Sequence, residues 1–405
     1  MSGFLETVSE PINDANATGP FSENTIDLAE ITSIDGGHWK LCLHPFEYKR
    51  SMNPDLSALL ADSSTNPFFN TAFLAASRDR MTQYPLLQLI MWEITGEVSQ
   101  ALFSAPMVKI PAKLLVPEHF KSFTHEFAPF GDPLIDQQNT DECLQKLSAL
   151  LKAAFDNGVA PIVFDYISDR SNLQSIEAAE SFSLGFTSME LGSRAAIQCA
   201  PGKEGKPLTS KKRARELRRQ LKNLQKEGEV TFEQVTDRFD IMLRFEEFLL
   251  METQGWKGRR GSSIHVIKKH AAFARQAVND LATEGICEIF TMRFNGKCIA
   301  STILFKSGGF YFPWKTTYDH LFSRYSPGSQ LMIHLTNEIV SRDNFVAADS
   351  LAGFGQSWMN HLWPDTTTLS RFVFAADQEE AGRLLNQLHQ KEGIKAALKK
   401  LLRRN

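Results

Sequence analysis

Three strand-like runs separated by two very short turns constrain the fold of this chain more than any other feature. The runs are Cys287–Phe294, Cys298–Lys306 and Phe310–Lys315. Asn295-Gly296 separates the first two, and this dipeptide favours a two-residue hairpin because both central residues of such a turn need positive φ. Ser307-Gly308-Gly309 supplies the second turn. The segment therefore predicts an antiparallel three-stranded meander.

A helix is predicted to follow this meander. Ser326-Pro327-Gly328-Ser329-Gln330 opens it, with Ser326 as the N-cap and Pro327 at the first helical position. It runs to about Ser341, and Phe345–Leu351 then reads as one more strand. First-turn amides lack partners, the helix dipole is positive there, and glycine lets an anion approach. This helix start is either a phosphate site or an ordinary capped terminus, and its place directly after the meander favours the phosphate site.

The rest of the chain mixes helical and strand patterns, so we expect an α/β (mixed α and β) fold. Asn66-Pro67-Phe68-Phe69 reads as a turn that opens a helix, and Pro111 marks the run 108–116 as an edge strand. The other predicted strands are 39–43, 86–94, 98–103, a run from 161 and 230–235, and the other predicted helices are 141–155, 241–253 and 264–281.

The length of 405 residues suggests two or three domains. Glycine and lysine accumulate between residues 201 and 207, where we place a boundary. The predicted parts are a flexible acidic arm (1–36), an N-terminal domain (37–200), a C-terminal domain (201–380) and a basic amphipathic helix (381–405). The first 36 residues contain no Lys or Arg and no signal or transit pattern, so the expected location is the cytoplasm.

The charge of the chain limits the kinds of partner it can bind, and its cysteines limit the kinds of cross-link and metal site it can form. The net charge of −3 means that binding to nucleic acid or membrane needs a local basic patch. The helix 211–226 is one such patch, suited to RNA, anionic lipid or donor phosphates, or simply a solvated face. The C-terminal helix is another, either for peripheral contact with the inner membrane face or docked on the core. Five cysteines without a CxxC pair predict neither a disulfide framework nor a metal site.

Four motifs in the second half occur in the order of a known family. They are Gly255-Trp256-Lys257-Gly258-Arg259-Arg260-Gly261-Ser262, Trp314-Lys315-Thr316-Thr317-Tyr318-Asp319, Tyr325-Ser326-Pro327-Gly328 and Ala348-Asp349-Ser350. Together they resemble the GNAT-superfamily acetyltransferases of the Fem-like or cellulose-biosynthesis-like (CelD/BcsL-type) family, over roughly 250–365. The resemblance implies two tandem GNAT-like domains with mixed, mainly antiparallel sheets flanked by helices, the second holding the donor.

The resemblance also implies an activity: transfer of an acetyl or longer acyl group from a CoA-type thioester to an amine. The chain departs from the usual pyrophosphate motif, Gln/Arg-x-x-Gly-x-Gly/Ala, because Gly328 has no second glycine. The donor that the resemblance implies is acyl-CoA or an acyl carrier protein, with no permanently bound cofactor. The alternatives are a Fem-like aminoacyltransferase that uses charged tRNA and a non-catalytic partner in polysaccharide assembly. The acceptor would be a small molecule or a polysaccharide- or lipid-precursor amine.

The candidate catalytic residues are Lys315, Tyr318, Asp319 and Asp349. Lys315 would hold donor phosphates or an oxyanion, or be a solvated strand-end lysine. Tyr318 would protonate the leaving group, and Asp319 would accept the ammonium proton of the acceptor or merely form a turn. Donor-binding candidates are Ser326, Pro327, Gly328, Ser329 and Gln330, with Lys257, Arg259 and Arg260 in a loop that either closes over phosphates or only connects two helices.

Overall fold

The computed structural model describes residues 25–32, 37–46, 65–178, 184–198, 209–255, 263–355 and 357–402, without the side chains of 396 and 399–402. We call the part up to residue 198 the first half and the part from residue 209 the second half. The strands are β1 (Ile26–Thr32), β2 (His38–Pro45), β3 (Leu86–Thr95), β4 (Val98–Ile110), β5 (His119–Ser122), β6 (Leu134–Ile135), β7 (Ile162–Ser168), β8 (Gly185–Gln198), β9 (Val230–Val235), β10 (Cys287–Phe294), β11 (Lys297–Ser307), β12 (Phe310–Tyr318), β13 (Ala347–Asp349) and β14 (Asp365–Ala375). The helices are α2 (Thr71–Met81), α3 (Thr140–Asp156), α4 (Ser175–Ala178), α5 (Lys211–Glu227), α6 (Arg238–Gln254), α8 (Lys268–Thr283), α9 (Pro327–Val340) and α10 (Gln378–Leu402), with the 3-10 helices η1 (Pro67–Phe69), η2 (Asn172–Gln174), η3 (Ile264–Val266), η4 (His320–Tyr325) and η5 (Trp358–His361).

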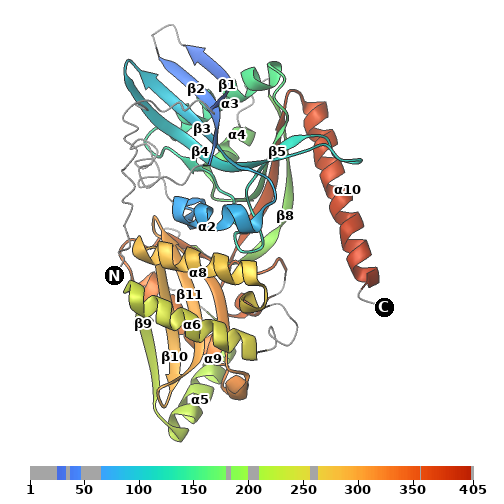
Figure 1. The fold of residues 1–405 in the computed structure, drawn as a ribbon. Coiled ribbons are helices and arrows are strands. Elements are labelled where there is room, and N and C mark those ends of the chain that lie inside the picture. Colours follow the sequence, from blue (N-terminus) through green and yellow to red (C-terminus); the bar gives the residue numbers. More distant parts are fainter. Residues whose placement is uncertain are drawn as a thin grey trace, which may run out of the picture.

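One sheet runs through both halves (Figure 1). Its strand order is β1-β2-β3-β4-β5-β7-β14-β8-β13-β12-β11-β10-β9, and β6 pairs with β4 off this path. β14, the last strand of the second half, lies between β7 and β8 of the first half and pairs antiparallel with both. The two halves are therefore joined by strand pairing as well as by side-chain packing.

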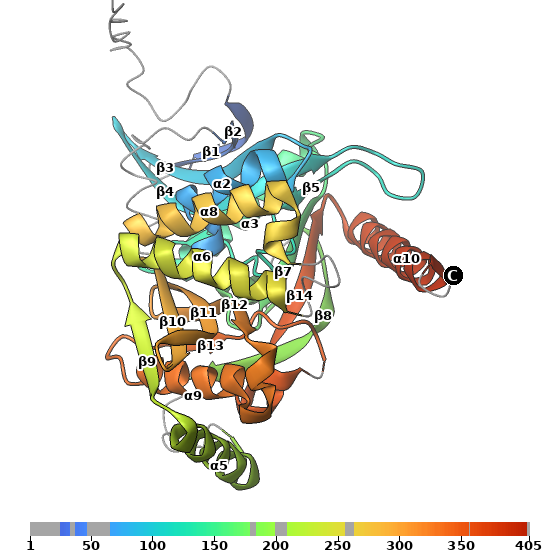
Figure 2. The ribbon, with the colours of Figure 1, turned by 60° about the horizontal axis from the view of Figure 1, so that its bottom comes forward.

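The sheet of the second half is covered on both faces (Figure 2). Alternate residues of a strand point to opposite faces. Ile289 of β10 belongs to the cluster with Phe245 of α6, whereas its neighbour Phe290 belongs to the cluster with Leu331 of α9. α6 and α8 thus cover one face and α9 the other, and the first turn of α9 comes to lie beside β12.

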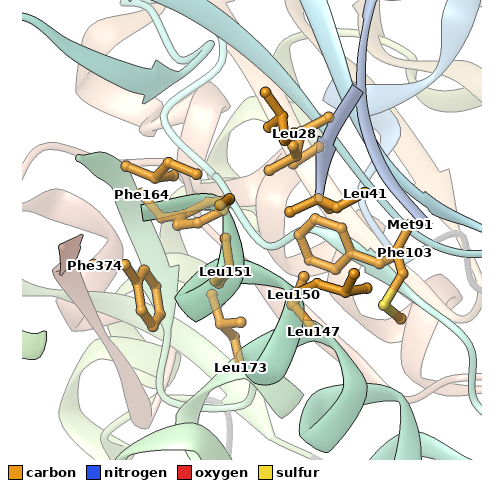
Figure 3. Close-up of a cluster of buried hydrophobic side chains, with 14 of the residues drawn as sticks. Leu28, Leu41, Met91, Phe103, Leu147, Leu150, Leu151, Phe164, Leu173 and Phe374 are labelled. Carbon is orange, nitrogen blue, oxygen red and sulfur yellow. The ribbon is translucent and has the colours of Figure 1, made fainter. Parts of the chain in front are cut away.

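The core of the first half forms between the sheet and α3 (Figure 3). Leu147, Leu150 and Leu151 lie about one helical turn apart on the same face of α3, and all are buried. The side chains they meet come from several strands, among them Leu41, Met91, Phe103, Phe164 and Phe374. Because Phe374 belongs to β14, the second half contributes to this core.

A second contact between the halves is aromatic. Asn66-Pro67-Phe68-Phe69, predicted as a turn, forms η1 and its N-cap, and Phe68 and Phe69 are fully buried. They share a cluster with Phe73 of α2 and with Phe273 of α8. Phe73 meets Phe273 edge to face at 5.4 Å. α2 is therefore packed against α8, as Figure 1 also shows.

Most predicted elements of the second half are confirmed, and three predictions are corrected. The arm 1–36 is not flexible throughout, because residues 26–32 form β1 and pair with β2. The run 108–116 is not a separate edge strand: β4 continues to Ile110 and ends where Pro111 removes the next amide donor. Ser326 is the N-cap of α9, but by a left-handed backbone (φ 51°) and without a side-chain cap bond.

The N-terminal turns of the C-terminal helix α10 pack against β8 and β14. Ala381, Leu384 and Leu388 are buried against Val373, whereas Ile394 and Leu398 are about half exposed. Docking on the core thus holds for the first turns. The exposed apolar residues further along leave peripheral membrane contact as a prediction. Among the described helices, none is both long and apolar enough to cross a membrane.

Candidate functional site

The site begins where two neighbouring strands separate. β12 and β13 run parallel and pair only through Phe310↔Ala347 and Tyr311↔Ala348. On its other edge, β12 stays paired with β11 as far as Tyr318. A bulge at Trp314 adds a bend, because Ile303 pairs with Lys315 and Leu304 with Pro313. Among the described residues, the β12 edge beyond Tyr311 therefore has no neighbouring strand.

A pocket of about 630 Å³ lies at this separation. It is formed mainly by the end of β12, the first turn of α9, and the loop after β13 together with the start of η5. Its lining residues include Lys315, Thr316, Tyr318, Ser326, Pro327, Gly328, Ser329, Ser350, Ser357 and Trp358. Six of them are predicted site residues, from motifs that the fold brings together: Lys315, Tyr318 and Ser326–Ser329.

The start of α9 gives the pocket a positive helix end. Pro327 has no amide hydrogen, and the Ser326 side chain caps no amide, so the first-turn amides of Gly328 and Ser329 have no partner inside the helix. No acidic residue stands in this first turn. A Cβ on Gly328 would lie 3.4 Å from Cδ1 of Tyr318, so the glycine keeps the backbone accessible beside that ring. This end of α9 suits an anion.

Lys315 is positioned by the first half of the chain. Its Nζ lies 4.6 Å from the ring centroid of Phe127, a cation–π contact. The indole of the adjacent Trp314 donates to the carbonyl of Phe127 over 2.7 Å. Burial, with a further contribution from the Lys315 charge, lowers the pKa of His125 to about 3. The ammonium thus sits at the pocket wall beside a histidine that stays neutral.

Three predicted residues have side chains engaged elsewhere, and none of them lines the pocket. Asp319 caps η4 through the amide of Leu321 and pairs with Lys297 over 2.8 Å, and this partner helps to hold its pKa below the ordinary value although burial opposes it. Asp349 forms a buried ion pair with Arg194. Gln330 donates to the carbonyl of Leu217 over 2.7 Å and so ties α9 to α5. The positions of Lys257, Arg259 and Arg260 lie outside the described residues.

The loop after β13 supplies pocket residues that sequence reasoning missed. Ser350, Ser357 and Trp358 line the pocket. The loop is held by the first half, since Gly355 donates to the carbonyl of Ser193 and Phe354 stacks on Tyr166 at 6.1 Å. The motif Ala348-Asp349-Ser350 reaches the start of this segment, but Ser350 was not predicted as a site residue, and no period or charge cluster marks the residues that follow.

The pocket contains few groups that titrate. Lys315 and Tyr318 are the titratable side chains among its described lining residues. Throughout the described ranges, no three His, Cys, Asp or Glu side chains are grouped so that they could hold a metal ion. The arrangement is therefore equipped to bind an anionic carrier and to orient a reacting group through peptide dipoles, a cation and a phenol.

Part of the chain matches a known family. Residues 211–353 match the family model described as "Acetyltransferase (GNAT) domain". No curated protein matches the chain. Among solved structures, FemX is similar with a TM-score of 0.52 at 11% identity, over 80% of this chain and 96% of that one.

Two further structures show weaker likeness. The C-terminal domain (DUF2156) of a putative lysylphosphatidylglycerol synthetase from Agrobacterium fabrum has a TM-score of 0.47 at 12% identity, over 83% of this chain and 94% of that one. A tandem GNAT protein from the clavulanic acid biosynthesis pathway has a TM-score of 0.36 at 9% identity, over 82% and 98%. Such identities concern the fold alone. The predicted mixed α/β fold is confirmed, and residues 211–353, which match a GNAT-type acetyltransferase domain, contribute most of the pocket lining.

Proposed function

We propose that this chain is an N-acyltransferase that moves an acyl group from a coenzyme A thioester to an amine. The observation that carries the proposal is the pocket where β12 and β13 separate, with the start of α9 at its wall. Its volume of about 630 Å³ suits a carrier of coenzyme size, since ligand pockets span roughly 300–1,000 Å³. A pocket of this size at the donor position does not favour the non-catalytic alternative.

Two parts of the pocket wall would bind the donor: the first turn of α9 and the edge of β12. The first-turn amides at Gly328 and Ser329 would hold the pyrophosphate, because an anion there meets unpaired donors and the positive helix end. The pantetheine would run along the edge of β12 beyond Tyr311, where no described strand lies beside it and whose peptide groups match those of the carrier. Trp358 and Met359 supply apolar contact across the pocket.

Transfer would proceed by direct attack. The neutral acceptor amine forms the C–N bond, and a peptide amide of the β12 edge stabilises the oxyanion of the tetrahedral intermediate. The C–S bond then breaks, the amine loses a proton to solvent, and Tyr318 gives a proton to the departing thiolate and recovers one from water. Lys315 adds positive charge beside the developing oxyanion. Most of the rate would come from holding both substrates together.

The acceptor would enter from the side of the first half. Lys315 is held there by Phe127, and the loop after β13 is held there by Tyr166 and Ser193. We expect a small amine or an amine on a polysaccharide or lipid precursor. Placing the acceptor between the halves would also explain why the first half braces both sides of the pocket.

Calorimetric titration with acetyl-CoA and longer acyl-CoAs tests donor binding. Gly328→Asp should weaken binding by more than tenfold, because a carboxylate beside the phosphates repels them while an acidic first turn suits the helix. Gly382→Asp is the matched control, since Gly382 lies near the start of α10 with open space around it. Heat from none of the thioesters, or equal affinity for the wild type and both variants, would refute the proposed donor site.

A second candidate is transfer from aminoacyl-tRNA, and the exposed basic face of α5 favours it. Arg215, Arg218 and Arg219 all point to solvent. This candidate predicts tRNA binding that weakens steeply with salt, and a roughly uniform loss when Arg218 and Arg219 are both changed to Ala. Filter binding of charged tRNA at 50 and 200 mM salt distinguishes it from the thioester reaction.

A further inference from the structure

A second hollow, of about 380 Å³, lies beside the donor pocket. The start of α5 forms one wall, with Thr209, Ser210 and Arg213, and the segment from Asn360 to Pro364 forms the other. It belongs neither to the gap between β12 and β13 nor to the first turn of α9. Among its described lining residues, Arg213 is the one that carries a permanent charge.

The two hollows share their boundary. Ser329 lines the donor pocket, and its hydroxyl accepts a hydrogen bond of 3.3 Å from Nη2 of Arg213, which lines the second hollow. η5 also contributes to both hollows. Its residues Trp358 and Met359 line the donor pocket, and Asn360 and His361 line the second hollow. A ligand that leaves the donor pocket past Ser329 therefore meets Arg213 next.

The walls of the second hollow are held in place. Thr209 donates to the carbonyl of His361 and joins the two walls. Asn360 accepts from the amide and the hydroxyl of Ser357, at 2.7 and 2.9 Å. Trp363 donates to Thr336 of α9 over 2.9 Å. The hollow is thus built on the same helix that forms the donor pocket, so the spacing between the two is fixed.

The start of α5, which forms one wall of the second hollow, carries more positive than negative charge. Arg213 pairs with Glu216 over 3.0 Å, yet its side chain keeps 28% of its surface exposed. Lys211 and Lys212 precede it on the first turn of α5, which carries no acidic residue. The helix dipole adds to this charge. An anionic group with hydrogen-bond acceptors fits such a wall, and a guanidinium matches phosphate oxygens.

We propose that the second hollow binds the phosphorylated nucleotide end of the donor, with Arg213 on the ribose 3′-phosphate. This inference rests on the proposed function and narrows it. The pyrophosphate lies at Gly328 and Ser329, and the next charged group of the carrier reaches Arg213. A phosphopantetheine arm on a carrier protein has no nucleotide and leaves the second hollow unused. The donor is therefore a coenzyme A thioester rather than an acyl carrier protein.

The test compares coenzyme A with 3′-dephospho-coenzyme A, by calorimetry on the full chain. One charge-assisted hydrogen-bonded contact contributes about 1.5–3 kcal/mol, or about 10- to 100-fold in affinity. The wild type should bind coenzyme A at least tenfold more tightly than the dephospho form. Arg213→Ala should remove this preference by weakening coenzyme A alone.

Three further variants separate charge from structure. Arg213→Lys keeps a cation and should retain part of the preference. Glu216→Gln removes the competing carboxylate and should keep or increase it. Arg383→Ala removes an exposed arginine on α10 and should change neither affinity. Glu216→Gln and the wild-type comparison of the two ligands still test the inference if Arg213→Ala does not fold.

The outcomes separate the inference from the proposed function. Equal affinity of the wild type for both ligands overturns the inference and leaves donor binding intact. An equal loss for both ligands in Arg213→Ala also overturns it, because Arg213 would then act on the pyrophosphate or on the fold. Absence of binding by either ligand overturns the proposed function and the inference together.

Discussion

The carboxylate of Asp349 stands directly before the pocket-lining Ser350 and faces the guanidinium of Arg194 inside the molecule. The pair is closed by two contacts, at 2.6 and 2.8 Å, and Asp349 also accepts from the amide of Leu351 over 2.8 Å. Arg194 belongs to β8 and Asp349 to β13, which pair with each other. At the scale of residues, the pair fixes the end of β13 from which the pocket loop departs.

Breaking this ion pair should cost stability and spare the chemistry. Arg194→Met and Asp349→Asn each leave one buried partner without its counterpart, and a loss of about 3–5 kcal/mol is expected for the first. Urea unfolding measures the loss, and turnover per folded molecule should stay within a few-fold of the wild type. An Asp349→Asn protein with full stability and no turnover would instead support the catalytic role predicted from the sequence.

Asp132 should make stability depend on pH. Burial raises its pKa to about 7, although Ser168 donates to it through its amide and hydroxyl. Because the folded state holds a proton that the unfolded state has lost, the free energy of unfolding falls as pH rises from about 4 to about 7. One proton corresponds to at most about 1.4 kcal/mol per pH unit.

Asp132→Asn should remove this part of the slope in urea unfolding measured at pH 5 and pH 8. Asp141→Asn is the control, because Asp141 is exposed in the first turn of α3. If the Asp132→Asn slope matches that of the wild type, the carboxyl of Asp132 is ionised in the folded state throughout this range.

The residues of the candidate site show which contacts sequence motifs can predict and which they cannot. Lys315, Tyr318 and Gly328 come together because a meander and the helix after it are local, and their spacing can be read along the chain. The partner of Asp349 lies 155 positions away on a strand that no pattern predicted. Sequence reasoning therefore identifies which residues approach the pocket, but not which carboxylates are already paired.

At the scale of elements, β10–β12 are determined by local sequence, whereas β8 and β14 are determined by contacts with distant parts of the chain. Positive φ at Asn295 and Gly296 confirms the predicted hairpin, because local turn chemistry fixes it. β8 and β14 were not predicted. The first has a register shift beside Gly192, and both β8 and β14 owe their place to pairing with distant strands. The loop after β13 follows the same rule, since the first half holds it in place.

η5 contributes lining residues to both hollows, so a substitution that loosens η5 should weaken binding of the donor. Asn360→Ala removes the acceptor for two bonds from Ser357 and is expected to cost about 1 kcal/mol of stability. Affinity for coenzyme A should fall several-fold, as measured by calorimetry. Ser341→Ala at the far end of α9 removes one exposed side-chain bond and should leave affinity unchanged. An unaltered affinity in Asn360→Ala would show that η5 does not shape the donor site.

At the scale of the whole molecule, β14 makes the halves depend on each other. It pairs along its length with β8 and in part with β7, and it places Phe372 and Phe374 in the core of the first half. In return, Phe127 of the first half positions Trp314 and Lys315 at the pocket. β14 thus completes the first-half core, and the first half in turn holds two residues that line the pocket.

This exchange predicts that the first half does not fold alone. A fragment ending at residue 200 lacks β14, so β7 and β8 expose unpaired edges and the core loses two buried phenylalanines. Circular dichroism and amide exchange should show the fragment largely unfolded, whereas co-expression with residues 201–405 should restore a folded complex that binds coenzyme A. The same fragment with the 365–402 segment linked to its end should recover part of the structure, because the missing strand and helix α10 are then supplied. A fragment that is stable and protected from amide exchange would contradict this prediction. It would show that the first half folds without β14 and that β14 pairs with it afterwards.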